Sequence, residues 1–292
     1  MRGVVLSPTT NTGLLPPDGG TAMLRLACDT HTHTIFSRHA YSTVEENVRA
    51  AALQGFELLG VTDHFSPMIH GVGPEGASMR EFQEFINMRM WPREWHGVRL
   101  MHGCEADIVD LEGHLFGWNI PVAFHLSVPA EPPYEILQDV AFLQCDYVVA
   151  SVHEHTWADE ATRDELTNMY LRVLEHPKVL ILGHPGRSGL DFDEEAVAET
   201  ARDAGKLIEI NEASLYGRNH AHERCAHIAR ACARVGCMVS TASDAHISYD
   251  VARLERVRNL LEEMGFPSRL VATRDAETFL GIWQEGIPTA RW

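Results

Sequence analysis

The stretch Leu58-Leu59-Gly60-Val61-Thr62-Asp63-His64 contains the pattern that decides the fold, a short apolar run followed at once by acidic and imidazole side chains. A bounded apolar run of this length is typical of a strand that is buried on both faces of a parallel sheet. Similar runs stand beside polar residues elsewhere in the chain, namely at Asp29-Thr30-His31-Thr32-His33, Glu105, His153, His184 and Asp244. The sequence therefore predicts several parallel strands whose ends carry polar side chains of the same few kinds.

Helix-like segments separate the strand candidates along the whole chain. The expected strands are Leu24–Asp29, Leu58–Thr62, Arg99–Cys104, Asp146–Val152, Val179–Leu182, Leu207–Ile210 and Met238–Thr241. The expected helices are 42–55, 78–90, 163–174, 194–204, 221–235 and 251–263. Strands that alternate with helices predict a parallel sheet, and right-handed crossovers can close such a sheet into a barrel. Seven strand–helix repeats rather than eight predict an irregular, TIM-barrel-like (β/α)7 barrel of the α/β class, with a site at the carboxyl ends of the strands.

Composition excludes some classes of function. The chain has 292 residues and a hydrophobic content of 45%, which suits one large α/β domain. Its 24 basic and 41 acidic residues give a net charge of −17, which argues against a nucleic-acid-binding surface. The six cysteines form no CxxC pair, and we interpret them as buried reduced thiols. No apolar run reaches the roughly 18 residues of a membrane span, so we expect a cytoplasmic protein.

The first 22 residues differ from the remainder of the chain. They are rich in Thr, Pro and Gly and lack the basic and apolar regions of a signal peptide. We expect residues 1–22 to be a flexible extension in front of a domain that spans 23–292. Met23 stands directly before the first expected strand, which suggests the hypothesis that it is the natural start.

Histidines and acids near the strand ends fit a polynuclear metal site. His31 and His33 lie on the same side of an extended segment because side chains alternate with a period of two, and Asp244 and His246 repeat this spacing. Glu105 has two carboxylate oxygens with which it could bridge two ions. The full set of candidate ligands is His31, His33, His39, His64, Glu105, His153, His184, Asp244 and His246. Nine ligand-type residues at the ends of seven repeats are hard to obtain from packing alone.

Each element taken alone has a simpler explanation. An isolated His-x-His pair more often consists of surface or core histidines, and Gly183-His184-Pro185-Gly186 alone could be only a turn. His155 competes with His153 for the ligand role, and we favour His153 because it directly ends a strand. Imidazole and carboxylate ligands without thiolate favour zinc, manganese or iron, with zinc the default when no redox motif is present.

These motifs, in this order, resemble the PHP (polymerase and histidinol phosphatase) superfamily. The matching motifs are His31-Thr32-His33, Thr62-Asp63-His64, Glu105, His153, Gly183-His184-Pro185-Gly186 and Ser243-Asp244-Ala245-His246. The YcdX-like phosphatase branch is the most similar, through residues 37–43, 85–93 and 207–211. The resemblance covers roughly residues 23–285. Two departures are the extension 1–22 and Asn211-Glu212-Ala213-Ser214, where that branch more often has Asn-Asn-Ser-Ser.

The resemblance implies a distorted (β/α)7 barrel that holds three metal ions, usually zinc, and a homo-oligomer that is often a trimer. It assigns the first ion to His31, His33, Glu105 and Asp244. It assigns the second ion to His39, His64 and His246, and the third to Glu105, His153 and His184. Glu105 would therefore bridge two ions.

We accordingly expect a metal-dependent phosphatase, a hydrolase of phosphoric monoesters that acts on a small phosphorylated substrate. The ions would polarise phosphoryl oxygens and lower the pKa of a bridging water, whose hydroxide would attack phosphorus in line. Glu105 and Asp244 are expected to contribute to catalysis as ligands. Asp63, with Asp107 as a weaker candidate, is expected to orient ligands, although capping a strand end explains these acids as simply.

Three arginines are candidates for binding the phosphate, because a guanidinium recognises phosphate at two points. They are Arg187, Arg89 and Arg218, and a surface ion pair is the simpler explanation for each. Arg187 ranks first because it follows His184 on the same loop.

Three alternative functions remain open from the sequence. A phosphodiesterase or exonuclease could use the same ions, although the net charge of −17 argues against it. A histidinol phosphatase shares the chemistry but belongs to a different branch. A non-catalytic metal-binding protein would not need so complete a ligand set.

Overall fold

The computed structural model describes residues 23–216 and 220–290. The expected flexible extension, residues 1–22, and the candidate Arg218 therefore lie outside the described residues.

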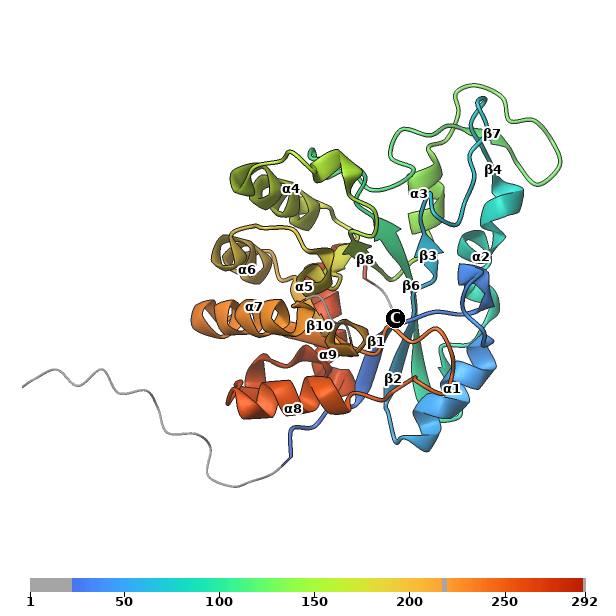
Figure 1. Cartoon of the computed structure of the whole chain (residues 1–292). Coiled ribbons are helices and arrows are strands. Elements are labelled where there is room, and N and C mark those ends of the chain that lie inside the picture. The colour runs from blue at the N-terminus through green and yellow to red at the C-terminus, as the bar shows by residue number, and fades with distance from the viewer. Residues whose placement is uncertain (1–22, 217–219, 291–292) are drawn as a thin grey trace, which may run out of the picture.

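Seven parallel strands form the centre of the molecule, and their order in space follows their order in the chain. They are β1 (Cys28–Thr32), β2 (Leu58–Val61), β6 (Val98–Asp107), β8 (Tyr147–Ser151), β9 (Val179–Leu182), β10 (Leu207–Asn211) and β11 (Val239–Ala242). The first and last strands approach each other where the Asp244 N–H donates to the His31 carbonyl over 2.9 Å. The sheet thus nearly closes into a barrel (Figure 1), which confirms the expected fold.

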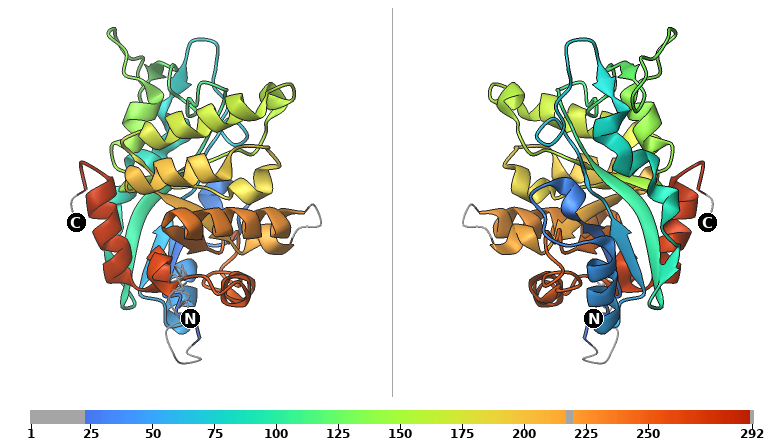
Figure 2. Two further views of the ribbon diagram at one scale, coloured as in Figure 1. Left: turned by 90° about the vertical axis from the view of Figure 1, so that its left-hand side faces the viewer. Right: turned by 90° about the vertical axis from the view of Figure 1, so that its right-hand side faces the viewer.

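Helices cover the outside of this barrel. On one side α4 (Arg163–Glu175), α6 (Glu194–Asp203), α7 (Ala221–Val235) and α8 (Glu255–Glu263) lie next to one another (Figures 1 and 2). On the other side lie α1 (Val44–Leu53), α2 (Gln83–Ile86) and α3 (Leu137–Phe142). Two of these helices begin with capping boxes, in which Thr43 pairs with Glu46 and Thr162 with Glu165, so local sequence fixes where they start.

Several short elements complete the fold. The strands β3 (His64–Phe65) and β5 (Glu94–Trp95) pair with β6, and β4 (Ala77–Ser78) pairs with β7 (Val122–Phe124) in a separate two-stranded sheet. The latter sheet projects from the barrel beside α2 and α3 (Figure 1). Elements of two or three residues carry no periodic pattern, so the sequence did not predict them.

Three elements differ most from the expected ones. The first strand begins at Cys28 rather than Leu24, because the Leu24 N–H donates to the Glu262 side chain and not to a neighbouring strand. The expected helix 78–90 is divided into two 3-10 turns, 79–82 and 88–90, with α2 between them. The division coincides with the non-helical backbone of Phe82, at φ −125° and ψ 25°. The expected helix 251–263 begins only at Glu255.

The carboxyl-terminal helix α9 (Ala276–Gly286) closes one end of the barrel. Its Phe279 and Trp283 pack against buried side chains at the amino ends of the strands, such as Leu58 and Tyr147. Trp283 also donates through Nε1 to the Asp146 carbonyl over 2.8 Å. With this end filled, the barrel interior is open to a site at the opposite end, where the carboxyl ends of the strands meet. Within the described ranges no helix combines the length and apolarity needed to cross a bilayer.

Candidate metal centre

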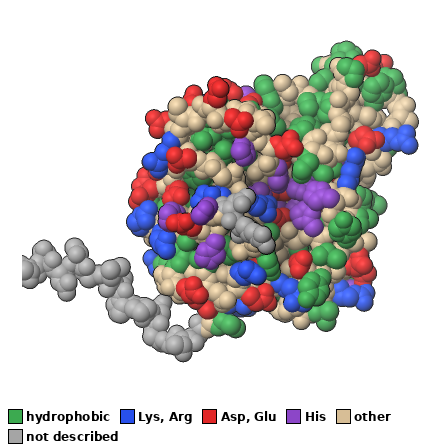
Figure 3. All heavy atoms as spheres, viewed as in Figure 1, with side chains coloured by type: hydrophobic (Ala, Val, Ile, Leu, Met, Phe, Trp, Pro, Cys, Tyr) green, Lys and Arg blue, Asp and Glu red, His purple; other side chains and the backbone are tan. Residues whose placement is uncertain are grey.

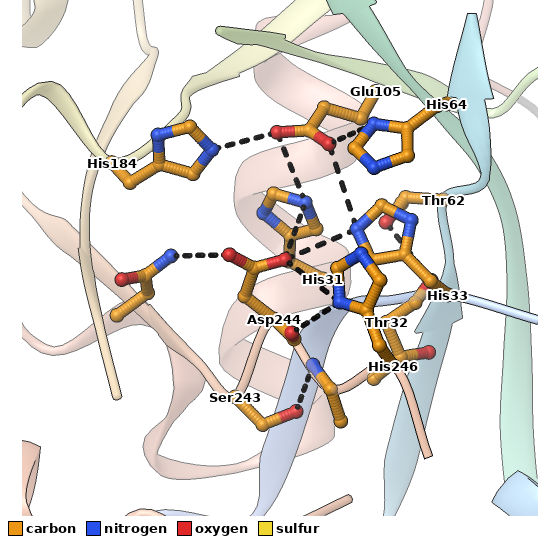
Figure 4. A network of polar contacts seen from close by, with 12 residues as sticks. His31, Thr32, His33, Thr62, His64, Glu105, His184, Ser243, Asp244 and His246 are labelled. Atoms are coloured by element: carbon orange, nitrogen blue, oxygen red, sulfur yellow. Dashed lines mark hydrogen bonds and ion pairs between the residues drawn. The ribbon is translucent and has the colours of Figure 1, made fainter. Parts of the chain in front are cut away.

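The site is centred on Glu105, a fully buried carboxylate near the carboxyl end of β6. Five histidines surround it, each with a ring nitrogen between 2.7 and 3.5 Å from a carboxylate oxygen. Figure 4 shows four of them, His31, His33, His64 and His184. The nitrogens nearest Oε1 belong to His31 at 3.3 Å, His153 at 3.4 Å and His184 at 2.7 Å. Those nearest Oε2 belong to His64 at 2.8 Å and His33 at 3.5 Å. The two oxygens therefore face different sets of imidazoles.

Asp244 forms the opposite wall of the site and is also buried. Its Oδ1 lies 3.1 Å from His33 Nε2 and 3.8 Å from His31 Nε2. Its Oδ2 contacts Nη2 of Arg187 at 2.7 Å. The backbone of Asp244 has a φ of 57°, a left-handed conformation that aspartate tolerates better than most residues and that is often kept at functional sites.

His39 and His246 form the exposed side of the site. Their Nε2 atoms are 3.0 Å apart and their rings stack at a centroid distance of 4.7 Å. The rings of His64 and His246 each stack on His33 at 4.2 Å. Histidine side chains gather in the middle of the face seen in Figure 3, so the centre opens to solvent there.

The donor atoms fit divalent metal ions in their spacing and in their lack of other hydrogen-bond partners. Ligand atoms of a tetrahedral zinc ion lie about 3.3 Å apart, since each bond is about 2.0 Å long. The distances of 3.1 Å (His33 to Asp244), 3.3 Å (His31 to Glu105) and 3.4 Å (His153 to Glu105) are close to that spacing. Among the described residues, His31 Nε2, both ring nitrogens of His64 and Glu105 Oε2 are buried without a hydrogen-bond partner. Such atoms are costly to bury unless a further group binds them.

The geometry groups these donors into three overlapping sets whose ligand atoms lie within 4.8 Å of one another. The sets are His31 with His33 and Glu105, His33 with His64 and His246, and His64 with Glu105 and His153. The first set agrees with the first ion that the resemblance implies. The other two differ in detail, because His33 and His64 each approach two groups.

The charges of the two acids are stabilised by their surroundings. Burial by itself would raise the pKa of Glu105, but the surrounding histidines, His153 first, hold that pKa well below its usual range. Burial likewise opposes ionisation of Asp244, whereas Arg187 and His31 hold its pKa well below normal. Both carboxylates are therefore charged at neutral pH and suited to bind cations.

The imidazoles fall into two groups, according to whether their surroundings lower or raise their pKa. Burial, followed by the neighbouring His64, lowers the pKa of His33 well below its usual value, and burial with Arg187 lowers that of His184. These rings are neutral at pH 7, as a metal ligand must be. For His153, Glu105 and Asp107 outweigh burial and raise the pKa to about 10. A cation that binds His153 must therefore displace a proton.

Two further acids contact the candidate ligands by different routes. Asp107 accepts directly from His153 Nδ1 over 2.7 Å, which leaves Nε2 of that ring turned toward Glu105. Asp63 instead accepts from the Thr34 backbone N–H and from the Ser37 hydroxyl, over 2.7 and 2.6 Å. Its influence passes through Ser37, whose Oγ lies 3.0 Å from His33 Nδ1. Asp107 thus has the closer contact with a ligand, although the sequence ranked Asp63 first.

A residue that the sequence did not single out, Glu209 on β10, also contacts this network. It is 1% exposed, and its Oε1 lies 3.0 Å from His31 Nδ1. The sequence does contain a sign of Glu209, since it is one acid within the apolar run Leu207-Ile208-Glu209-Ile210-Asn211. It was missed because only polar residues at the ends of the expected strands were considered as ligands.

The candidate arginines have different locations. Arg187 lies on the short helix α5 (Pro185–Ser188) directly after His184 and reaches Asp244. Arg89 is exposed on the 88–90 turn, where its backbone N–H donates to Gln144, just before β8 and so near the amino ends of the strands. The structure does not bring Arg89 to the Glu105 centre. His155 is half exposed and contacts Asp159 at 3.9 Å, away from Glu105.

Fold and site together define an α/β-barrel protein with a candidate metal centre, and comparisons with known proteins show its family. The model of the PHP domain family matches residues 29–215. A probable phosphatase of Caldicellulosiruptor saccharolyticus is 34% identical over 87% of this chain and 95% of its own length. A probable phosphatase of Photobacterium profundum is 35% identical over 90% of this chain and 95% of its own length.

Two solved structures share the fold. One is the histidinol phosphate phosphatase of Lactococcus lactis, solved with zinc, L-histidinol and phosphate. It has a TM-score of 0.50 and 17% identity, and the match covers 84% of this chain and 95% of that one. The other is a putative histidinol phosphatase of Listeria monocytogenes, with a TM-score of 0.52, 15% identity and coverage of 79% and 99%. The chain belongs to the PHP domain family.

Proposed function

We propose that this protein is a metal-dependent phosphatase that hydrolyses small phosphoric monoesters at the Glu105 centre. The observation that carries the proposal is the contact of one buried carboxylate with five imidazoles, among donor atoms that lack other partners. The probable phosphatases at 34 to 35% identity support the reaction class.

Nine residues supply donors for three ions in this proposal. We assign His31, His33, Glu105 and Asp244 to the first ion, His39, His64 and His246 to the second, and Glu105, His153 and His184 to the third. Zinc is the preferred metal, with manganese or iron as alternatives, because all donors are nitrogen or oxygen. Zinc in the Lactococcus lactis structure supports that preference.

Bound divalent cations supply Lewis acidity, since they lower the pKa of coordinated water toward neutrality and withdraw charge from phosphoryl oxygens. The protein side chains complete the site in three ways. Glu105 presents its two oxygens to different imidazoles and thereby holds the donor sets at a fixed separation. Arg187, 35% exposed, offers guanidinium N–H groups to a phosphate that enters from solvent. Asp107 holds the His153 ring in place.

A monoester fits this site better than a nucleic-acid backbone. The chain has a net charge of −17, and a protein that follows a polyanion usually has a basic stripe. Among the described arginines and lysines, Arg187 is the one whose side chain forms an ion pair with the Glu105–Asp244 network. One guanidinium beside several cations suits a single terminal phosphate group.

The test compares p-nitrophenyl phosphate with bis(p-nitrophenyl) phosphate, before and after chelation. We expect chelator-sensitive hydrolysis of the monoester, little of the diester, and a loss of at least about 100-fold in Glu105→Gln. Asp110→Asn is the matched control, because Asp110 also contacts a histidine, His114 at 2.8 Å, but lies in a separate group. Faster hydrolysis of the diester than of the monoester would contradict the proposal and indicate a phosphodiesterase. Histidinol phosphate is one of the monoesters to include in a later substrate screen.

A further inference from the structure

Glu209 occupies an unusual position for an acid, within the interior of the barrel. On β10 the alternate residues Ile208 and Ile210 join the apolar core beneath the helices, so Glu209 points to the opposite side, into the barrel. It is 1% exposed. A carboxylate is costly to bury unless donors satisfy both of its oxygens, so its partners should explain why it is there.

Those partners belong to two different parts of the candidate metal centre. Oε1 lies 3.0 Å from Nδ1 of His31. His31 is on β1, and β11 lies between β1 and β10 in the barrel. Oε2 accepts from the backbone N–H of His184 over 2.9 Å, at the start of the loop after β9. Asn211 Nδ2 also approaches Oε2, at 3.3 Å. One carboxylate thus spans two ligands that are assigned to different ions.

We propose that Glu209 is a positioning residue that couples the binding of two metal ions, by fixing the His31 ring and the His184 backbone with one carboxylate. The proposal rests on the metal centre described above. The proposal extends the description of that centre, because the two ions then depend on Glu209, a residue that binds neither of them.

The contact with His31 selects the tautomer that can bind a metal. A carboxylate oxygen only accepts, so Nδ1 of His31 carries a proton, and Nε2 is the nitrogen left to give its lone pair to a cation. That Nε2 atom lies 3.3 Å from Glu105 Oε1 and is buried without a hydrogen-bond partner among the described residues. Histidine ligands commonly have such a carboxylate on their second nitrogen, and its removal weakens metal binding about 10- to 100-fold.

The contact with His184 fixes a strained piece of backbone. His184 has a φ of 27° and a ψ of 50°, which is unfavourable for a residue with a side chain. The bond from its N–H to Glu209 helps to hold this conformation, in which Nε2 reaches Glu105 at 2.7 Å.

Glutamine at position 209 would have nearly the same shape but could not satisfy both partners. If its NH2 group faced His31, Nδ1 would have to accept and the proton would move to Nε2, the atom that binds the metal. If the NH2 group faced the His184 N–H, two donors would oppose each other. Glu209→Gln therefore disrupts one ligand directly in either orientation, without leaving a cavity. The other ion is weakened as well, because Glu105 Oε1 contacts both His31 and His184.

The experiment measures bound zinc by plasma mass spectrometry after equilibrium dialysis against zinc buffers of graded free concentration. We expect Glu209→Gln to bind two of the ions about 10- to 100-fold more weakly and to retain the ion assigned to His39, His64 and His246. Glu209→Asp keeps the charge but shortens the reach, and we expect it to weaken the same two ions. Glu212→Gln is the matched control, since this buried acid accepts from the Arg256 and Val257 N–H groups, away from the ligands.

The outcomes separate this proposal from the proposed function. Selective weakening of two ions in both Glu209 variants, with wild-type binding in the Glu212 control, supports the coupling. Wild-type zinc affinity in a folded Glu209→Gln or Glu209→Asp variant overturns it and leaves the phosphatase proposal intact. Equal weakening of all three ions also overturns it, because the effect is then not confined to the two coupled sites. Absence of zinc from the wild-type protein itself overturns both.

Discussion

Replacement of Arg187 tests how the site binds phosphate. The guanidinium lies 2.7 Å from Asp244 and 35% of the side chain is exposed, so it can reach both the centre and an entering substrate. Burial alone would lower the pKa of Arg187, but Asp244 and Glu105 raise it, and the group stays charged. We consider Arg187→Ala, which removes the group, and Arg187→Lys, which keeps the charge without the planar fork.

The magnitude follows from the interaction that is lost. A hydrogen bond to a charged group contributes about 1.5 to 3 kcal/mol, and about 1.4 kcal/mol corresponds to a factor of ten in rate. Arg187→Ala should therefore lower kcat/KM for a monoester by about 10- to 100-fold. Arg187→Lys should lie between the alanine variant and the wild type, because one charged contact survives.

The assay is steady-state hydrolysis of p-nitrophenyl phosphate, with bound metal measured on the same samples. Arg163→Ala is the matched control, since Arg163 is an exposed arginine paired with Asp191 at 3.6 Å. Unchanged kcat/KM in Arg187→Ala with full metal content would refute the assignment. Loss of metal, with activity restored by added zinc, would show that Arg187 acts only by supporting Asp244.

Three further predictions concern single side chains. Asp107→Asn should lower zinc affinity about 10- to 100-fold, since the His153 tautomer is no longer fixed, and dialysis against zinc buffers measures this. Glu212→Ala should lower the free energy of unfolding by about 1 to 3 kcal/mol in urea, because the first N–H groups of α8 lose their acceptor. Burial, with Arg93, lowers the pKa of His102 to about 3 from 6.5, so only the unfolded state takes up its proton as the pH falls below 6.5. Between about pH 6 and 4, the free energy of unfolding of the wild type should therefore fall more steeply than that of His102→Leu, by up to about 1.4 kcal/mol per pH unit. Equal slopes for the two proteins would contradict this.

The strands and most of the helices could be predicted from sequence because their signals are local. Buried parallel strands need continuous apolar runs, and Thr43 and Thr162 begin their helices through capping boxes that are visible in the sequence. The projecting sheet of β4 and β7 could not be predicted in this way, since two- and three-residue strands depend on tertiary contacts.

The candidate site was predictable to the extent that its residues stand at strand ends. The side chains of His31, His184 and Glu105 converge because parallel strands end at one rim. The supporting contacts were not predictable, because they depend on which face of a strand points inward and on how loops turn. Glu209 acts from within a strand, and Arg89 follows a turn that leads away from the rim.

The most direct test of the account is the number of metal ions bound per chain, measured by plasma mass spectrometry on wild type and Glu105→Gln after reconstitution with zinc or manganese. Glu105 contacts donors of all the proposed groups, including His64 at 2.8 Å and His184 at 2.7 Å. The account predicts about three ions in the wild type, the loss of at least about one in Glu105→Gln, and chelator-sensitive monoester hydrolysis in the wild type alone. A wild-type protein that binds no metal after reconstitution, or that hydrolyses the monoester equally well in excess chelator, would contradict the central claim.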